Sequence, residues 1–300
     1  MSRIEVLQTP PLSQEEVTIE HTNEVMLLDR ELYSGELPLR EFGVSTETIA
    51  TFQTVIPAPR ANTYVLNLQR AEVRSGILEL KTNFTTMRSQ FALRRWIKEV
   101  DSHSDLYQTI LNNIRPIGSQ MATKTLDNYI LMEERGRVEN PGTYAVAPAG
   151  GVETRNWRLR PDPFIAIQGE AWEETGMLPR ADYNQPLLLG IARDYQDGFN
   201  PTFCFYAESK LTLPELILKA DSIAPEAGEH LRLFGLPLDS DEIIRFYLEK
   251  KGRTSGQGYS PVLLYADVAF SKGNGAWLKG AARELNAKGC EITLFQDRFS

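Results

Sequence analysis

The alternation of apolar and polar positions predicts strands in both halves of the chain. In the first half, residues 64–68 and 77–80 alternate with a period near two, and Ser75-Gly76 lies between them, so a β-hairpin is expected. In the second half, the apolar runs at 128–133, 143–147, 187–192, 202–207 and 231–238 are typical of strands. Asn140-Pro141-Gly142 supplies a turn between the first two of these runs, and Gly150-Gly151 follows the second.

Helical spacing of apolar residues appears between these strands. Segments 83–100 and 104–114 are predicted helices, as are 239–249 and most of 261–286. The clearest helix covers residues 162–175, because Asp162 is a suitable N-cap, Pro163 fits the first helical position and Gly176 provides a stop. Strands and helices therefore alternate, which favours an α/β or α+β fold.

A break at Arg115-Pro116-Ile117-Gly118 suggests two units. We expect an N-terminal α+β extension over residues 1–119 and a second domain over residues 120–300. A chain of 300 residues is long enough for two domains with a substantial core.

Composition narrows the classes of function. Apolar residues make up 42% of the chain and charged residues 24%, which is typical of a globular protein. The net charge of -8 argues against a general basic surface for nucleic acid or anionic membranes. If the substrate is itself an anion, this charge has to be offset locally, and a divalent cation is the natural candidate.

The cysteines and the lack of long apolar runs suggest a reduced, cytoplasmic protein. Cys204 and Cys290 cannot build a disulfide framework or a zinc site, and Cys204 lies in an apolar run where a buried free thiol is expected. No stretch approaches the roughly 18 apolar residues of a membrane span. The residues after Met1 do not resemble a secretory leader.

Three carboxylates lie on one face of the helix predicted at 162–175. Glu170, Glu173 and Glu174 fall within about 100° of one another at helical spacing. Neighbouring carboxylates repel by about 3 kcal/mol per pair at an effective dielectric constant near 20, and oxygen-only ligands select hard cations such as Mg²⁺ or Mn²⁺. An ordinary acidic surface stripe is the alternative for this pattern alone. The other face is expected to pack into the core through Phe164, Ile165, Ala171 and Trp172.

The glycine corner and this helix together resemble the Nudix box, whose pattern is G-x5-E-x7-R-E-U-x-E-E-x-G-U with U a bulky apolar residue. The second half of the box matches through Glu170, Glu173, Glu174, Gly176 and Met177, with Ala171 a small version of U. The chain departs from the pattern in three ways. Gly169 stands where the family has an arginine, the usual loop glutamate is absent at its spacing, and the stretch from Gly151 to Glu170 is longer than usual. Glu153 follows the glycines, and Asp162 is a candidate substitute for the missing glutamate.

Segments 185–193, 205–206 and 225–230 resemble the divergent Nudix subfamily that hydrolyses UDP-glucose and UDP-galactose and that also carries an N-terminal extension. The resemblance implies an α/β/α sandwich with a mixed sheet. It implies a Mg²⁺-dependent enzyme, with Mn²⁺ as an alternative cofactor, that cleaves a UDP-sugar to UMP and sugar 1-phosphate. The partner is then a small-molecule nucleoside diphosphate derivative. Two alternatives stay open: hydrolysis of ADP-ribose or a dinucleotide, and a catalytically silent nucleotide-binding module.

The same resemblance implies roles for individual residues. Glu170 and Glu174 would bind the metal together with a main-chain carbonyl at Gly150 or Gly151. Glu173 would act through a water molecule or beside the ligands, so that the three glutamates form the catalytic set. The general base is open between Glu170 or Glu174 and the loop acids Glu226 or Glu229. The candidate substrate-binding residues are Arg135, Arg137, Arg193 and Trp157, each of which could instead be an ordinary solvated or structural residue. For His230, a structural role is favoured over stacking on the substrate.

Overall fold

The computed structural model describes residues 3–25, 63–86, 115–136, 142–154, 162–194, 200–226, 230–254, 256–295 and 298–299. Most of the helix expected at 83–100 and all of that expected at 104–114 lie outside these residues. The same is true of Arg137, Trp157 and Glu229.

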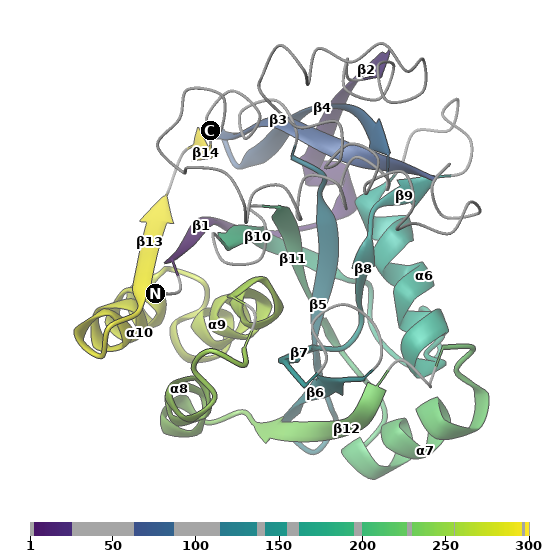
Figure 1. Ribbon diagram of the computed structural model, residues 1–300, viewed down its shortest axis with the longest axis vertical. Helices are drawn as coiled ribbons and strands as arrows, with labels where there is room; N and C mark the ends of the chain where they lie inside the picture. Colours follow the sequence, from purple (N-terminus) through teal and green to yellow (C-terminus); the bar gives the residue numbers. More distant parts are fainter. Residues whose placement is uncertain are drawn as a thin grey trace, which may run out of the picture.

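A nine-stranded sheet forms the centre of the molecule (Figure 1). Its order is β12 (His230–Pro237), β6 (Tyr129–Arg135), β5 (Gly118–Lys124), β11 (Pro201–Glu208), β10 (Leu187–Asp194), β1 (Arg3–Leu12) and β13 (Glu291–Phe295). The short strands β7 (Tyr144–Val146) and β8 (Ala149–Gly151) pair with β6 and β5. The pairs β5–β11 and β1–β13 are parallel and the others are antiparallel, so the sheet is mixed, as expected.

A second sheet contains β14 (Arg298–Phe299), β3 (Tyr64–Arg74), β4 (Ile77–Thr86) and β2 (Val17–Val25), with β9 (Glu153–Thr154) also on β3. The predicted hairpin is confirmed as β3–β4, whose turn places Ser75 and Gly76 at positive φ. The helix start predicted at residue 83 is wrong, because residues 83–86 continue β4. Asn83 pairs there with Asn67 of β3, and their side-chain amides are joined by a 2.6 Å hydrogen bond.

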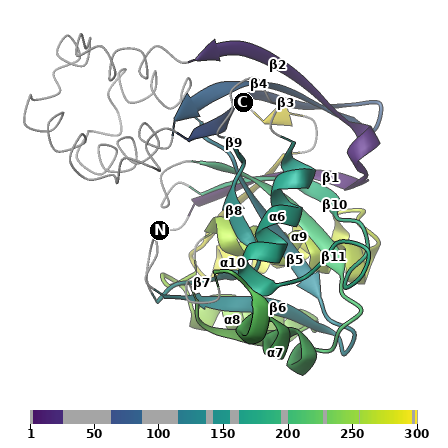
Figure 2. The ribbon, with the colours of Figure 1, turned by 90° about the vertical axis from the view of Figure 1, so that its right-hand side faces the viewer.

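Helices cover both faces of the large sheet (Figures 1 and 2). On one face lie α8 (Ser240–Glu249), α9 (Gly256–Ser271) and α10 (Ala276–Ala287). On the other lie α6 (Pro163–Thr175), α7 (Leu213–Ile223) and the second sheet, which is joined to β1 through the short helix η1 (Gln14–Glu16). Neighbouring residues of β5 divide between two cores: Ala122 belongs to the first and Met121 to the second. The expected α/β/α sandwich is confirmed.

The first strand of the chain belongs to the large sheet. β1 pairs with β10 and β13, whose residues lie far away in the sequence. β5 begins at Gly118, beside the expected boundary at residue 119. The division into an extension and a domain stays a prediction, but β1 crosses it.

The helix expected over 261–286 is divided, since α9 ends at Ser271 and α10 begins at Ala276. Cys204 is a free thiol and fully buried, as expected. Within the part of the chain that the structure describes, no helix combines the length and apolar character needed to cross a membrane.

Candidate functional site

Helix α6 carries the candidate carboxylates and has the ends that its sequence predicts. The Asp162 side chain accepts a 2.8 Å hydrogen bond from the main-chain nitrogen of Phe164, which satisfies one of the free donors of the first turn. Pro163 is the first helical residue. Gly176 adopts the left-handed conformation, with φ of 67°, and terminates the helix.

The buried face of α6 differs from the expected one. Phe164 and Ala171 are buried as predicted, but Ile165 and Trp172 are 67% and 37% exposed, so their assignment to the core was wrong. The buried stripe instead continues to Glu174 at the C-terminal end of the helix. One of the carboxylates therefore lies on the side of α6 that faces the large sheet.

Glu170 lies directly against the glycine corner. A Cβ atom built on Gly150 would stand 2.0 Å from the Glu170 carboxyl carbon, so the carboxylate fills the space that a side chain there would occupy. Gly150 belongs to β8. The resemblance implied that these two residues lie together, and the structure places them side by side.

Glu174 is 2% exposed and accepts a 3.0 Å hydrogen bond from the main-chain nitrogen of Ala149. Burial raises the pKa of Glu174 well above its ordinary value, and the negative charges of Glu133 and Glu170 add to the increase. Arg135 and the Ala149 hydrogen bond act in the opposite direction. Glu174 therefore belongs to a group of electrostatically interacting carboxylates that includes Glu170, the other predicted metal ligand.

Glu173 points away from this group. Its side chain is exposed, and its pKa is raised by partial burial and by the charge of Glu226. The main-chain nitrogen of Glu226 also donates a 2.8 Å hydrogen bond to the Glu173 carbonyl. The predicted trio is thus divided between Glu170 and Glu174 on one side and Glu173, beside Glu226, on the other.

Glu133 and His230 are residues of this region that the sequence analysis did not place in the site. Glu133 is 2% exposed on β6, and the Nδ1 atom of His230 on β12 contacts its Oε2 atom. The Nε atom of Arg135 lies 3.3 Å from Glu133 Oε1. The signal that could have found Glu133 is a charged residue at an inward position of an otherwise apolar strand.

The predicted substrate-binding residues Arg135 and Arg193 lie in different parts of the large sheet, on β6 and β10. Arg135 lies with the glutamates, and its contact with phosphate stays a prediction. Arg193 is on β10, two strands from β5, and forms a 3.7 Å ion pair with Glu5. Asp162 caps α6 eight residues before Glu170, and its substitution for the missing box glutamate stays a prediction.

The chemistry of these donors suits a hydrated divalent cation. Across the described ranges, no three His, Cys, Asp or Glu side chains are grouped closely enough to hold a metal ion by themselves. Mg²⁺, however, usually keeps several water molecules and uses one or two carboxylates together with substrate phosphates. Glu170 and Glu174 provide oxygen ligands of that kind, and Gly150 brings its main chain against the first of them.

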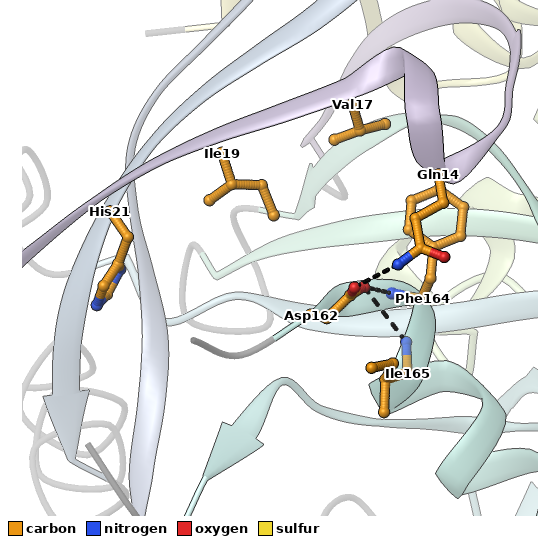
Figure 3. Close-up of a pocket in the computed structure, with 7 residues that line it drawn as sticks. All are labelled: Gln14, Val17, Ile19, His21, Asp162, Phe164 and Ile165. Carbon is orange, nitrogen blue, oxygen red and sulfur yellow. Dashed lines mark hydrogen bonds between the residues drawn. The ribbon is translucent and has the colours of Figure 1, made fainter. Parts of the chain in front are cut away.

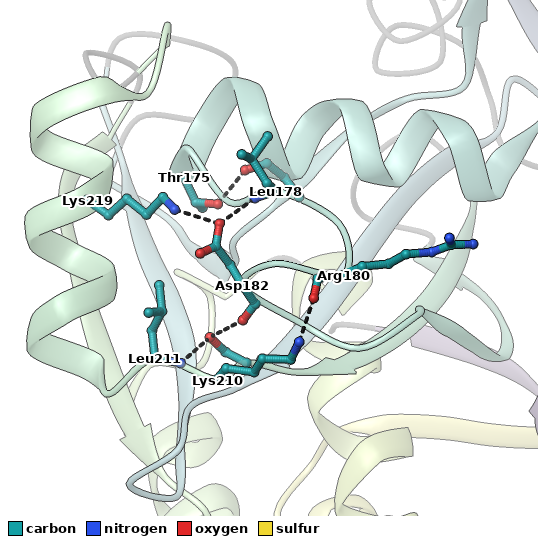
Figure 4. A network of polar contacts seen from close by, with 9 residues as sticks. Thr175, Leu178, Arg180, Asp182, Lys210, Leu211 and Lys219 are labelled. Carbon is teal, nitrogen blue, oxygen red and sulfur yellow. Dashed lines mark hydrogen bonds and ion pairs between the residues drawn. The ribbon is translucent and has the colours of Figure 1, made fainter.

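The segment after α6 is fixed by Asp182 (Figure 4). Its Oδ2 atom accepts hydrogen bonds of 2.7 Å from the Leu178 nitrogen and 2.6 Å from Lys219 Nζ. Its carbonyl accepts bonds from Ser209 Oγ and the Lys210 nitrogen. These contacts connect the segment after α6 to α7 and to the end of β11, and so hold the turn that follows the helix end at which Glu174 lies.

A pocket of about 360 Å³ lies at the other end of α6 (Figure 3). Most of its wall is apolar, with a few polar groups, which is typical of small-molecule sites. It is lined by residues of the first segment of the chain and by the first turn of α6: Gln14, Val17, Ile19, His21, Asp162, Phe164 and Ile165.

Comparisons with known proteins give distant similarities to Nudix structures. No protein-family model matches the sequence, and no curated protein is significantly similar to it. The Nudix domain of Shewanella oneidensis NrtR, solved with ADP ribose, is 11% identical, with a TM-score of 0.34 over 52% of this chain and 90% of that one. The MutT protein of Methanosarcina mazei is 13% identical, with a TM-score of 0.32 over 56% and 94%.

A third similar structure is a bifunctional NMN adenylyltransferase/ADP ribose pyrophosphatase of Francisella tularensis, complexed with AMP and a manganese ion. It is 15% identical, with a TM-score of 0.35 over 63% of this chain and 48% of that one.

Proposed function

We propose that the protein is a divalent-cation-dependent hydrolase of the Nudix type that cleaves the pyrophosphate of a nucleoside diphosphate linked to another group. One observation carries the proposal: the Glu170 carboxylate lies on Gly150 while Glu174 is bound to the Ala149 nitrogen, so helix carboxylates and glycine strand form one site. The Nudix-box resemblance of the same residues supports it. A UDP-sugar is the proposed substrate, because segments 185–193 and 225–230 resemble the UDP-sugar subfamily.

The charges of the site match this chemistry. A pyrophosphate is an anion, and the protein has a net charge of -8, so the substrate needs local compensation. A bound Mg²⁺ ion supplies positive charge to the phosphate oxygens and makes an attacking water more acidic. Glu170 and Glu174 would hold the ion, and Arg135 would contribute a fixed positive charge beside it. Hydrolysis of a UDP-sugar adds one water across the P–O–P bond and yields UMP and sugar 1-phosphate.

We also propose that the first segment of the chain covers one side of the substrate cleft. The pocket at the start of α6 supports this, because η1 and β2 form one wall and α6 the other. Deletion of residues 1–119 would be a poor test, since it removes β1 from the large sheet. A single substitution in the pocket wall is the cleaner experiment.

Incubation with Mg²⁺ and a panel of nucleotides tests the function. UMP release from UDP-glucose that falls at least about 100-fold in Glu174→Gln is the expected result, because loss of an ion ligand removes several kcal/mol of transition-state stabilisation. Glu134→Gln is the matched control, as Glu134 pairs at the surface with Arg232 and Arg253. Turnover of ADP-ribose or dinucleotides alone would assign one of these compounds as the substrate in place of a UDP-sugar. Binding that raises the melting temperature without product would indicate a silent module.

A further inference from the structure

Glu133 and His230 form a buried pair beside the helix carboxylates. The two side chains are 2% and 3% exposed, and they belong to adjacent strands, β6 and β12. Arg135 lies against the second carboxylate oxygen. Burying a carboxylate costs free energy unless hydrogen-bond or ion-pair partners compensate for the lost water. His230 and Arg135 are such partners, and they hold the Glu133 carboxylate in one position.

Glu133 faces the candidate site. Leu131, two residues earlier on β6, packs in the same core as Phe164 and Ala171 of α6. Because side chains alternate along a strand, Glu133 lies on that face too.

A second feature indicates that a ligand is needed here. Within the described part of the chain, the fully buried hydroxyl of Ser119 has no hydrogen-bond partner. Ser119 lies opposite Gly150 in the β5–β8 pairing. Directly opposed residues of antiparallel strands project on the same side, so the Ser119 side chain lies on the face of the sheet that Glu170 covers at Gly150. Buried polar groups without partners usually mark a bound water or ion.

We propose that Glu133, held by His230, is a positioning residue that sets the affinity of the Glu170–Glu174 site for a divalent cation. It does so through its charge and not as a ligand, since these side chains do not form a closed three-ligand group. Arg135 brings a positive charge against Glu133. The charge of Glu133 adds to those of the ionised Glu170 and Glu174 carboxylates, and together they attract a divalent cation. This inference rests on the proposed function.

Two substitutions at residue 133 separate charge from shape. Glu133→Gln keeps the shape and removes the charge, whereas Glu133→Asp keeps the charge and shortens the side chain. Titration calorimetry with Mn²⁺ alone should show affinity about tenfold weaker for Glu133→Gln and a smaller loss for Glu133→Asp. A purely structural role would give the reverse order. Glu134→Gln, on the opposite face of the same strand, should bind Mn²⁺ as the wild type does.

Thermal unfolding without metal shows whether each variant is folded. If Glu133→Gln does not fold, His230→Gln replaces it, because this variant keeps the charge of Glu133 but releases its carboxylate from His230. Its Mn²⁺ affinity should fall by less than about tenfold, as in Glu133→Asp, and an unchanged affinity would overturn the inference. Suppose that the wild type binds Mn²⁺, that Glu174→Gln weakens this binding and that Glu133→Gln does not. That result would refute the inference about Glu133 without contradicting the proposed function. A wild-type protein that binds no Mn²⁺ at millimolar concentration would refute both.

Discussion

Glu170 occupies the space that a side chain at residue 150 would need. The carboxyl carbon and one oxygen of Glu170 would each lie 2.0 Å from a Cβ on Gly150, far inside van der Waals contact. The obstacle is the end of a flexible side chain and not the main chain, so it can move. The absence of a side chain at Gly150 therefore determines the position of a carboxylate.

Gly150→Ala should separate activity from stability. The Glu170 carboxylate would be displaced at little cost to folding, so we expect an unfolding free energy within about 1 kcal/mol of wild type. Turnover should fall by about 100-fold, because misplacing a catalytic group by about 1 Å has effects of that size. Chemical denaturation and steady-state kinetics check the two values.

Gly169→Ala is the matched control for that substitution. A Cβ on Gly169 would meet no atom within 4 Å, and the residue lies inside α6. Alanine there should stabilise the protein by roughly 0.5–1 kcal/mol and leave turnover unchanged. Equal losses of activity in the two variants would contradict the role assigned to Gly150.

Asp267 should make stability depend on pH in the acid range. Burial alone would raise its pKa, but hydrogen bonds from Ser271, from the Leu278 and Gly275 nitrogens and from Gln8 outweigh that effect and lower the pKa. A lowered pKa means that the ionised form stabilises the fold above the unfolded pKa of about 3.9 and that this stabilisation is lost as the pH falls below it.

Asp267→Asn should therefore cost about 1–3 kcal/mol at pH 7, since one buried donor loses its acceptor. The difference from wild type should shrink below about pH 4. Urea unfolding at several pH values measures it, with the exposed Asp221→Asn as control. A difference that grows on acidification would contradict the assignment.

Asp182 should hold the turn after α6 more strongly than Lys219 does. Asp182→Ala leaves the Leu178 nitrogen without its acceptor and should destabilise the protein by about 1–3 kcal/mol. Lys219→Met removes only the partly exposed ion pair and should cost less than about 1 kcal/mol. Hydrogen exchange of the Leu178 amide reports the local effect, and equal protection in the two variants would be the contrary result.

Ile19→Trp tests the pocket at the start of α6. Ile19 lies on β2 and lines the pocket, so a larger side chain there should reduce the space available to the substrate. We expect KM to rise about tenfold, corresponding to roughly 1.4 kcal/mol, while Mn²⁺ affinity stays unchanged. An unchanged KM would show that the substrate does not occupy this pocket.

Local signals in the sequence were sufficient for much of the fold. Asp162, Pro163 and Gly176 determine the ends of α6 because capping depends on a few adjacent residues. The β3–β4 hairpin follows similarly from Ser75-Gly76. The place of β1 could not be predicted, because its partners β10 and β13 lie at distant positions in the chain.

The same limit applies to the candidate site. Helical spacing grouped Glu170, Glu173 and Glu174, but it could not show that Glu173 turns toward Glu226. Nor could it show that Glu133 approaches Glu174 from a separate strand. The exposure of Trp172 likewise depends on which face of α6 meets the sheet, and this is decided by tertiary packing.

The most direct test of the account is UMP release from UDP-glucose by wild-type protein and Glu174→Gln, measured chromatographically with and without Mg²⁺. The account predicts UMP and glucose 1-phosphate in equal amounts, only with Mg²⁺ present, and a rate at least about 100-fold lower in the variant. Equal rates for the two proteins, or a rate that persists in a chelator, would contradict it.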